Sequence, residues 1–425
     1  MICKYLTGAA VAALTIAAPV FAETVAITGG TVWTGTQDAA IEDGVVLIVD
    51  DKIVAVGDSR LSVPSNATVI DADGGWITPG IFVPFARTGL VEVGAEATTN
   101  DTSADESKYS AALNAADSFN PSATAIDVTR IEGVTRLAVA PANGNSIFAG
   151  RGFVADTSGE ADSITQENVF QLLSLGESGA GISGGSRSAA WATLRAAIDD
   201  SQNFTSRYIT TPNGAALNRV DAEALAPAAR GQQLLLVRIH RASDIRRLIG
   251  MLSDYPELDV AIVGATEGWI VAEELAEAGI PVIIDPFDNL PASFEQLGAT
   301  SHNAERLIEA GVKTAFAHLG NDAHQSRLVL QSAGNAVANG VSRADAMRAI
   351  TSIPADIFGQ SDLGRLNSGA IADLVVWDGD PLEVTSAPTH VLIDGEQQSM
   401  ESRQTLLRDR YLSLEDGDLP LAYRK

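Results

Sequence analysis

The sequence predicts an α/β protein in which strand and helix segments alternate through residues 80–359, between two shorter β-rich ends. Two observations carry this prediction. The runs 234–239 and 260–263 are apolar throughout most of their length, which is typical of strands buried on both faces. Segments with helical spacing of apolar residues lie between such runs. Repeated units of this kind form either a doubly wound sheet or a (β/α)8 barrel, and the alternation alone leaves both open.

Residues 1–22 have the pattern of a secretory signal peptide. Lys4 gives a positive start, residues 9–18 are apolar, and Val-Phe-Ala at 20–22 is a small-residue cleavage pattern. The apolar run is shorter than the roughly 20 residues that a membrane span requires. We therefore expect cleavage after Ala22 and a periplasmic or secreted protein. The single cysteine, Cys3, would leave with this segment, so the mature chain would form no disulfide and no thiolate metal site.

The charge balance limits the partners of the protein. The chain has 54 acidic and 28 basic residues, a formal net charge of −26, and 46% apolar residues. Such a composition supports a large buried core, and such a surface repels nucleic acid and anionic lipid. We expect a small-molecule ligand or substrate, no nucleic acid and no membrane span. A homodimer stays open.

Short β-strands are expected at both ends of the chain. Within residues 24–79, runs rich in Val and Ile are separated by Gly and Asp, as where 45–49 and 53–56 are joined by two aspartates. Residues 369–378 and 390–395 have the same pattern near the other end. Strands at this spacing indicate hairpins of a small β-domain.

Three helices of the α/β region have readable ends. The helices predicted at 270–278 and 303–310 are each followed by glycine, the residue that best adopts the left-handed conformation after a helix. Ser342 with Asp345 predicts the start of a helix over 343–358. A further amphipathic helix is expected at 402–412, docked on the outside of the α/β region.

The stretch from Trp76 to Leu90 connects the N-terminal strands to the first strand of the α/β region through Pro79-Gly80. It resembles the corresponding crossing in the amidohydrolase superfamily, especially the imidazolonepropionase-like branch, and further matches at 43–48 and 372–377 extend the resemblance over nearly the whole mature chain. The resemblance implies a (β/α)8 TIM-like barrel with a small β-sandwich built from both chain ends. The implied parts are a signal peptide (1–22), a composite β-sandwich (23–79 plus 360–398), the barrel (80–359) and a C-terminal helix and tail (399–425).

The resemblance also implies a metal-dependent site, and the sequence departs from it. Family members hold one or two divalent ions at the C-terminal ends of the barrel strands, where a metal-bound hydroxide attacks the substrate. The first strand there ends in His-x-His, but these positions are Phe85 and Arg87 here. Phenylalanine offers no donor atom, and arginine is a permanent cation. The bridging lysine of the fourth strand is also absent, since no lysine occurs between Lys108 and Lys313.

The remaining ligand positions are mixed. The fifth strand keeps His240, with Arg238 at the place of an earlier histidine, and the sixth-strand position corresponds to Gly264. After the eighth strand come His318, Asp322 and His324; Asp322 could replace the family aspartate if the loop there is longer. A new metal site from these residues and purely structural roles for the histidines both stay open. We expect no metal cofactor, with zinc only if such a rearranged site exists.

Three functions are compatible with these residues. By family, the protein would be a hydrolase acting on carbon–nitrogen bonds other than peptide bonds, with weak, altered or absent catalysis through Asp322, His324 and His240. Alternatively, it would be a non-catalytic exported protein that binds a small anionic or amide ligand. Its contact residues would be Arg87, Arg238 and Glu267, since two guanidinium groups can hold a carboxylate. A third hypothesis is a barrel that serves only as a scaffold.

Overall fold

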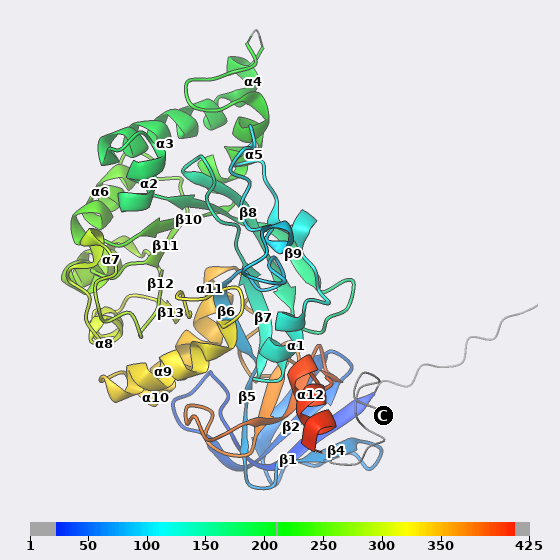
Figure 1. The fold of residues 1–425 in the computed structure, drawn as a ribbon. Coiled ribbons are helices and arrows are strands. Elements are labelled where there is room, and N and C mark those ends of the chain that lie inside the picture. Colours follow the sequence, from blue (N-terminus) through cyan, green and yellow to red (C-terminus); the bar gives the residue numbers. More distant parts are fainter. Residues whose placement is uncertain (1–22, 210, 413–425) are drawn as a thin grey trace, which may run out of the picture.

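Two eight-stranded sheets organise the protein, which is described here by a computed structural model of residues 23–209 and 211–412. The expected signal peptide, with Cys3 and Lys4, lies outside these residues, as does the tail from 413. Figure 1 shows the smaller sheet below and the larger sheet, with its helices, above. Within the described ranges, no helix has the length and apolar character that crossing a membrane would require.

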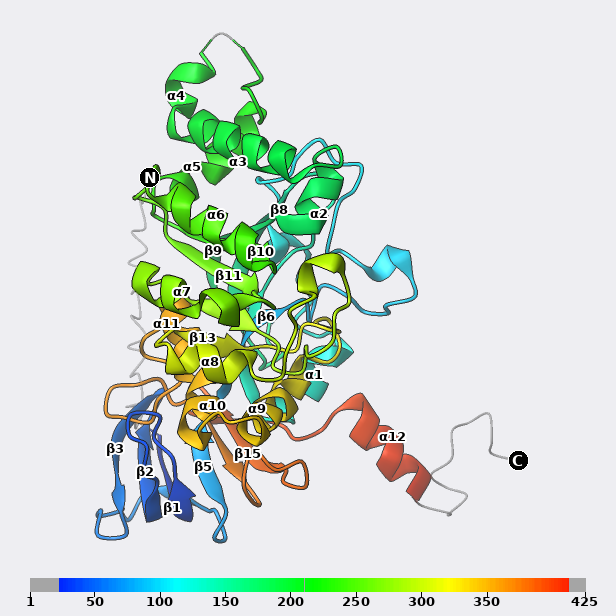
Figure 2. The ribbon, with the colours of Figure 1, turned by 90° about the vertical axis from the view of Figure 1, so that its left-hand side faces the viewer.

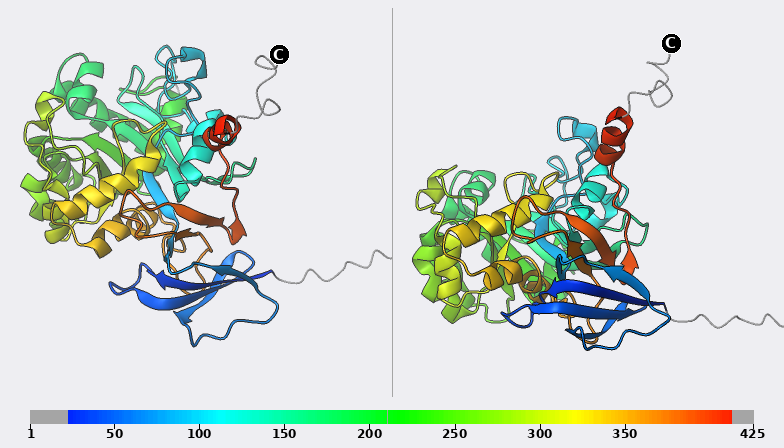
Figure 3. Two further views of the ribbon diagram at one scale, coloured as in Figure 1. Left: turned by 60° about the horizontal axis from the view of Figure 1, so that its bottom comes forward. Right: turned by 90° about the horizontal axis from the view of Figure 1, so that it is seen from below.

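The smaller sheet combines strands from both ends of the chain (Figure 3). Its order is β16-β15-β14-β5-β1-β2-β3, with β4 paired to β1. The two ends meet where β14 runs antiparallel to β5, with Leu374 opposite Pro79. The expected association of the ends is therefore present as one sheet, while a two-layered β-sandwich stays a prediction. The strands are β1 (Thr24–Val32), β2 (Ile41–Val49), β3 (Lys52–Asp58), β4 (Thr68–Asp71), β5 (Trp76–Pro79), β14 (Leu374–Trp377), β15 (Pro388–Ile393) and β16 (Glu396–Gln397).

The larger sheet is a nearly closed barrel with the order β13-β12-β11-β10-β9-β8-β7-β6. Seven of its strands are parallel, so their C-terminal ends share one edge, here called the barrel mouth. The strands are β6 (Ile81–Ala86), β7 (Val134–Val139), β8 (Phe148–Asp156), β9 (Ile164–Ser174), β10 (Leu234–Ile239), β11 (Val260–Gly264), β12 (Val282–Ile284) and β13 (Thr314–Phe316).

Strand β8 departs from the expected (β/α)8 barrel because it runs antiparallel to both of its neighbours. No helix lies between β7 and β8 or between β8 and β9. Parallel neighbours require a crossover of about a dozen residues or more, so these short connections force two hairpins. Gly152 permits the second hairpin to pack closely, since a Cβ there would lie 2.0 Å from Cζ of Phe170 on β9.

Helices cover the outside of the barrel, and Figure 2 shows α6, α7 and α8 following one another across it. The predicted ends at Gly279 and Gly311 are confirmed, with φ of 66° and 86°. The helices are α1 (Thr124–Arg130), α2 (Gly176–Ile182), α3 (Arg187–Gln202), α4 (Phe204–Arg207), α5 (Arg219–Ala229), α6 (Ala242–Leu252), α7 (Ala272–Ala278), α8 (Asn303–Glu309), α9 (Val329–Ala338), α10 (Arg343–Ala349), α11 (Ser352–Ile357) and α12 (Arg403–Leu412).

The single helix expected at 343–358 is two helices, α10 and α11. The predicted start is confirmed, because Ser342 Oγ accepts the N–H of Asp345 at 3.1 Å. The helix breaks at Ile350 because Pro354 has no N–H to donate to the Ile350 carbonyl. That carbonyl instead accepts the N–H of Phe82 at 2.9 Å, which fixes the helix pair to the first barrel strand.

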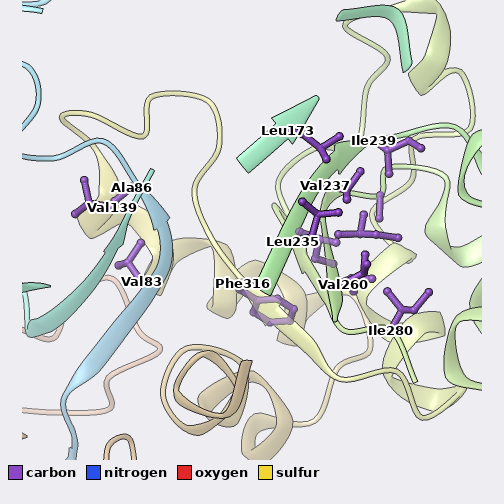
Figure 4. Close-up of a cluster of buried hydrophobic side chains, with 14 of the residues drawn as sticks. Val83, Ala86, Val139, Leu173, Leu235, Val237, Ile239, Val260, Ile280 and Phe316 are labelled. Atoms are coloured by element: carbon purple, nitrogen blue, oxygen red, sulfur yellow. The ribbon is translucent and has the colours of Figure 1, made fainter. Parts of the chain in front are cut away.

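Two apolar layers stabilise the barrel. The inner cluster receives buried side chains from all eight strands, including Phe82 and Phe85 of β6. The outer cluster lies between the strands and the helices; Figure 4 shows part of it, with Leu235, Val237 and Ile239 projecting from β10. Helix α12 contacts α1 on the outside of the barrel, where it was expected, but none of its side chains is fully buried.

A buried ion cluster connects the barrel to the smaller sheet. The Arg136 guanidinium of β7 donates to both carboxylate oxygens of Asp373 at 2.6 and 2.9 Å, and to Asp394 at 2.7 Å. Burial raises the pKa of Asp394 and of the neighbouring Asp156, while the Arg136 charge opposes that rise. The Asp373 carbonyl also accepts the N–H of Gly80 at 3.0 Å, at the crossing between the two sheets.

Candidate functional site

An ion pair occupies the barrel mouth between the first and eighth strands. Arg87, directly after β6, places Nη1 2.5 Å from Oδ2 of Asp322, and both side chains are largely buried. The Arg87 N–H also donates to the Asp322 carbonyl at 2.8 Å. The loop after β13 therefore returns to β6 and closes the barrel where no strand pairing joins β13 to β6. Asp322 reaches the first strand as the longer-loop hypothesis requires, but its carboxylate is paired with a cation.

Phe85 is fully buried in the inner cluster, and the Arg87 guanidinium lies 5.4 Å from the centre of its ring. The two residues at the expected His-x-His positions thus contact each other. The aromatic face and the Asp322 carboxylate together hold the arginine in place.

Arg238, at the end of β10, is a second cation at the mouth. Burial lowers its pKa, the Arg87 charge lowers it further, and the carboxylates of Asp322 and Glu295 oppose these effects. Its guanidinium makes no hydrogen bond or ion pair with any residue that the structure describes. A partly buried cation with free donors next to another cation is suited to bind an anion.

His240 follows Arg238 and is a buried, neutral imidazole. Its Nδ1 lies 2.8 Å from Thr266 Oγ1 and 3.2 Å from Gln296 Nε2. Burial, together with the Arg238 charge, lowers the pKa of His240 to about 4. Thr266 in turn donates to Asp288 at 3.2 Å, and burial raises the pKa of Asp288. His240 therefore belongs to a hydrogen-bonded network under the loop after β12.

A side chain at position 264 would overlap the His240 ring, which occupies the space beside Gly264. A Cβ at Gly264 would lie 2.5 Å from Cε1 and 2.8 Å from Nδ1 of the imidazole, and Gly264 has φ of 101°. The position that the family resemblance assigns to a sixth-strand histidine is thus filled by a fifth-strand histidine.

Gly264→Ala is expected to lower the free energy of unfolding by about 2 kcal/mol, because it adds a steric overlap to a strained backbone. Urea unfolding would measure this loss, and the loss should shrink in a His240→Ala background. Gly279→Ala is the matched control, since its φ is 66° but no atom lies within 4 Å of the added Cβ. Equal losses at the two glycines would contradict the steric account.

The other predicted residues lie in separate surroundings. Glu267 accepts the N–H groups of Ala242 and Gly298, both at 3.0 Å, so both of its oxygens support the loops. His318 places Nδ1 3.4 Å from Oδ2 of Asp285. His324 lies beside Gly94, in the loop that follows the first barrel strand. The roles predicted for Glu267 and His324 stay predictions.

The residues at the expected metal positions do not fit a pair of divalent ions. Phe85 offers no donor, Arg87 is a cation bound to Asp322, and Gly264 has no side chain. The fourth strand, β9, ends at Ser174, whose hydroxyl donates to Asn143 at 2.5 Å. Across residues 23–209 and 211–412, no three His, Cys, Asp or Glu side chains come close enough to hold an ion. The structure thus does not bring the hypothetical rearranged site together.

Sequence reasoning missed three polar residues of the mouth, which lie in the loop after the seventh strand, and named Asp285 only as a possible counter-charge to the two arginines. Asp285 accepts the N–H of Leu319 at 2.9 Å, Asp288 and Gln296 join the His240 network, and Glu295 accepts the N–H of Glu177 at 2.6 Å. Asp285 directly follows a buried strand, a position that favours a functional residue in a barrel. Glu295 and Gln296 lie about ten residues into a loop, where no pattern indicates burial.

Part of the chain matches a known protein family, and one curated protein is similar to most of it. Residues 250–400 match the model of the amidohydrolase family. Among curated proteins, the amidohydrolase tasK of Hapsidospora irregularis is 24% identical over 400 residues, which are 86% of this chain. The chain spans only 40% of the length of that relative.

Solved structures give the same fold. An amidohydrolase from Thermotoga maritima MSB8 superposes with a TM-score of 0.78 at 23% identity, over 88% of this chain and 99% of the other. A prolidase complexed with N-methylphosphonate-L-proline and a Xaa-Pro dipeptidase with bound methionine each have a TM-score of 0.57, at 18% and 17% identity. Both of these cover 89% of this chain and 100% of their own.

Proposed function

We propose that this chain is an amidohydrolase-superfamily protein whose barrel mouth binds a small carboxylate. The family assignment is supported by the fold and by the match of residues 250–400 to the family model. Two-metal hydrolysis of carbon–nitrogen bonds is then weak or absent. The observation that carries the proposal is the Arg87–Asp322 ion pair. This pair joins Arg87, at a position where family members have a metal ligand, to Asp322, the candidate replacement for the family aspartate.

The ion pair supports loss of the usual chemistry for an electrostatic reason. A divalent ion at this place would have to displace the Arg87 guanidinium from Asp322 and would then lie beside that cation. His240 does not replace the missing base well. With a pKa of about 4 it is a weak proton acceptor, and its Nδ1 already contacts Thr266.

Arg238 supports the carboxylate ligand. Its guanidinium has free donors, is partly buried and is repelled by Arg87. A bound anion would relieve that repulsion and would form charge-assisted hydrogen bonds in a site of low dielectric. An amide ligand would accept hydrogen bonds from Arg238 but would not neutralise its charge, so we infer that the ligand is a carboxylate. The protein is further proposed to be exported, on the basis of residues 1–22.

Elemental analysis of the mature protein tests the first half of the proposal. We expect less than stoichiometric zinc, manganese and iron, and no chelator-sensitive cleavage of N-acyl amino acids or dipeptides. Tightly bound metal at one or two equivalents, together with cleavage that a chelator abolishes, would overturn it.

Calorimetric titration with succinate and benzoate tests the second half. Arg238→Gln is expected to weaken binding by about tenfold or more, because it removes a charge-assisted interaction. Arg60→Gln is the control, since Arg60 pairs only with Asp58 on the surface of the smaller sheet. Equal binding by the Arg238 variant and the wild type, or no binding by either, would refute a carboxylate site at the mouth.

A further inference from the structure

A hollow lies on the outer wall of the barrel, away from the mouth. Its volume is about 480 Å³, within the range typical of small-molecule sites. Gln233 marks its position, because this residue directly precedes β10 and so lies at the end of the strand opposite the mouth. The lining residues come from β8, β9, helix α5 and two connecting segments: Ala112, Arg151, Asn168, Val220, Glu223, Ala224, Pro227, Gln232 and Gln233.

The hollow contains one cation and one anion that do not pair. Arg151, on β8, donates from Nη2 to the Ala112 carbonyl at 3.2 Å. Glu223, on α5, is exposed. No ion pair joins these two side chains or links either of them to another described residue. Opposite charges that line one hollow without contact leave space for a ligand that carries both charges.

Unsatisfied polar groups belong to two of the lining residues, Gln233 and Arg151, and to Gln171, which is paired with Arg151 in the sheet but does not itself line the hollow. Gln233 is 8% exposed; its Nε2 donates to the Asn168 carbonyl at 2.7 Å, while its Oε1 has no partner. Gln171, opposite Arg151 in the β8–β9 ladder, is fully buried with both amide atoms unpaired, and Arg151 Nε also lacks an acceptor. Buried polar groups are nearly always hydrogen-bonded, so such a cluster requires an explanation.

Helix α5 supplies the apolar side of the hollow. Pro227 lies inside the helix and has no N–H for the carbonyl of Glu223, one turn earlier. Val220 and Ala224 lie on the same stretch of helix. The hollow thus offers a guanidinium, a carboxylate and a small aliphatic surface.

We propose that this outer hollow binds a free α-amino acid as a zwitterion. The ligand carboxylate pairs with Arg151, the ammonium group pairs with Glu223, and a small aliphatic side chain packs on α5. A simple anion would be repelled by Glu223, and a simple cation by Arg151. The site is separate from the carboxylate site proposed at the mouth, and it does not depend on that proposal.

Calorimetric titration of the full-length Arg238→Gln variant, in which the carboxylate site proposed at the mouth is weakened, with L-valine, N-acetyl-L-valine and L-valinamide tests the assignment. N-acetyl-L-valine lacks the ammonium group, and L-valinamide lacks the carboxylate. We expect binding of L-valine and at least about tenfold weaker binding of both derivatives, because each loses one charge-assisted pair. No binding of L-valine, or equal binding of L-valine and N-acetyl-L-valine, would overturn the proposal.

Variants locate the site. Arg151→Gln and Glu223→Gln should each weaken L-valine binding by about tenfold or more, and Glu223→Gln should also reduce the preference over N-acetyl-L-valine. Glu277→Gln, at an exposed position on α7, is the matched control and should bind as the wild type does. Arg238→Gln should also bind L-valine normally. Loss of binding in Arg238→Gln, but not in Arg151→Gln, would assign L-valine to the mouth and refute the outer site.

Discussion

Replacing Arg136 with methionine is expected to lower the free energy of unfolding by about 3–5 kcal/mol, the largest stability effect predicted here. Arg136 is 3% exposed in its side chain and Asp373 is 2% exposed. Removing the guanidinium leaves the carboxylates of Asp373, Asp394 and Asp156 close together without a counter-charge at the joint between the two sheets. Urea unfolding at neutral pH measures the loss.

The pH dependence of this variant distinguishes electrostatics from lost packing. Without Arg136, the folded-state pKa values of Asp156 and Asp394 should rise further. A carboxyl group with a raised folded-state pKa stabilises the fold at low pH, and this stabilisation is lost as pH rises. The loss of unfolding free energy in the variant, relative to the wild type, should therefore be largest at neutral pH and smaller in acid. Arg60→Met, which breaks an exposed pair with Asp58, should have no measurable effect. A deficit below about 1 kcal/mol would contradict the role of the cluster.

The second-largest expected effect is a loss of wild-type stability in acid, caused by the protonation of His240. Its pKa is lowered to about 4 from an ordinary value of 6.5, so between these pH values the unfolded chain binds the proton and the folded chain does not. The stability that depends on a neutral His240 is present above about pH 6.5 and is lost progressively as pH falls towards 4. A shift of this size corresponds to about 3 kcal/mol.

The measurement compares urea unfolding of the wild type and His240→Asn from pH 7 to 4. Asparagine retains a polar group near Thr266 but does not titrate in this range. The carboxylates of Asp156, Asp288, Glu295 and Asp394 have raised pKa values and act in the opposite direction, so only the difference between the two proteins isolates the histidine. The wild type should lose about 3 kcal/mol more than the variant. Parallel curves would show that His240 titrates normally.

Local patterns were enough to identify much of the fold. The glycines after α7 and α8, the Ser342 cap and the apolar strands β10 and β11 follow from backbone sterics, hydrogen-bond satisfaction and burial. The reversal of β8 was not predicted, because the sequence around it gives no sign of which neighbour the strand will pair with. The break at Ile350 was also missed, although Pro354 was visible.

The sequence by itself determined which side chains are absent from the mouth: no imidazole at positions 85 and 87, and no lysine anywhere on the fourth strand. Covalent chemistry fixes that conclusion, whatever the packing. Only the tertiary structure decided which residues meet. It brought Asp322 to Arg87, His240 over Gly264, and Arg151 into one hollow with Glu223. These contacts join residues distant in the sequence or on different strands and helices, and their geometry depends on how the sheet closes and how its loops return.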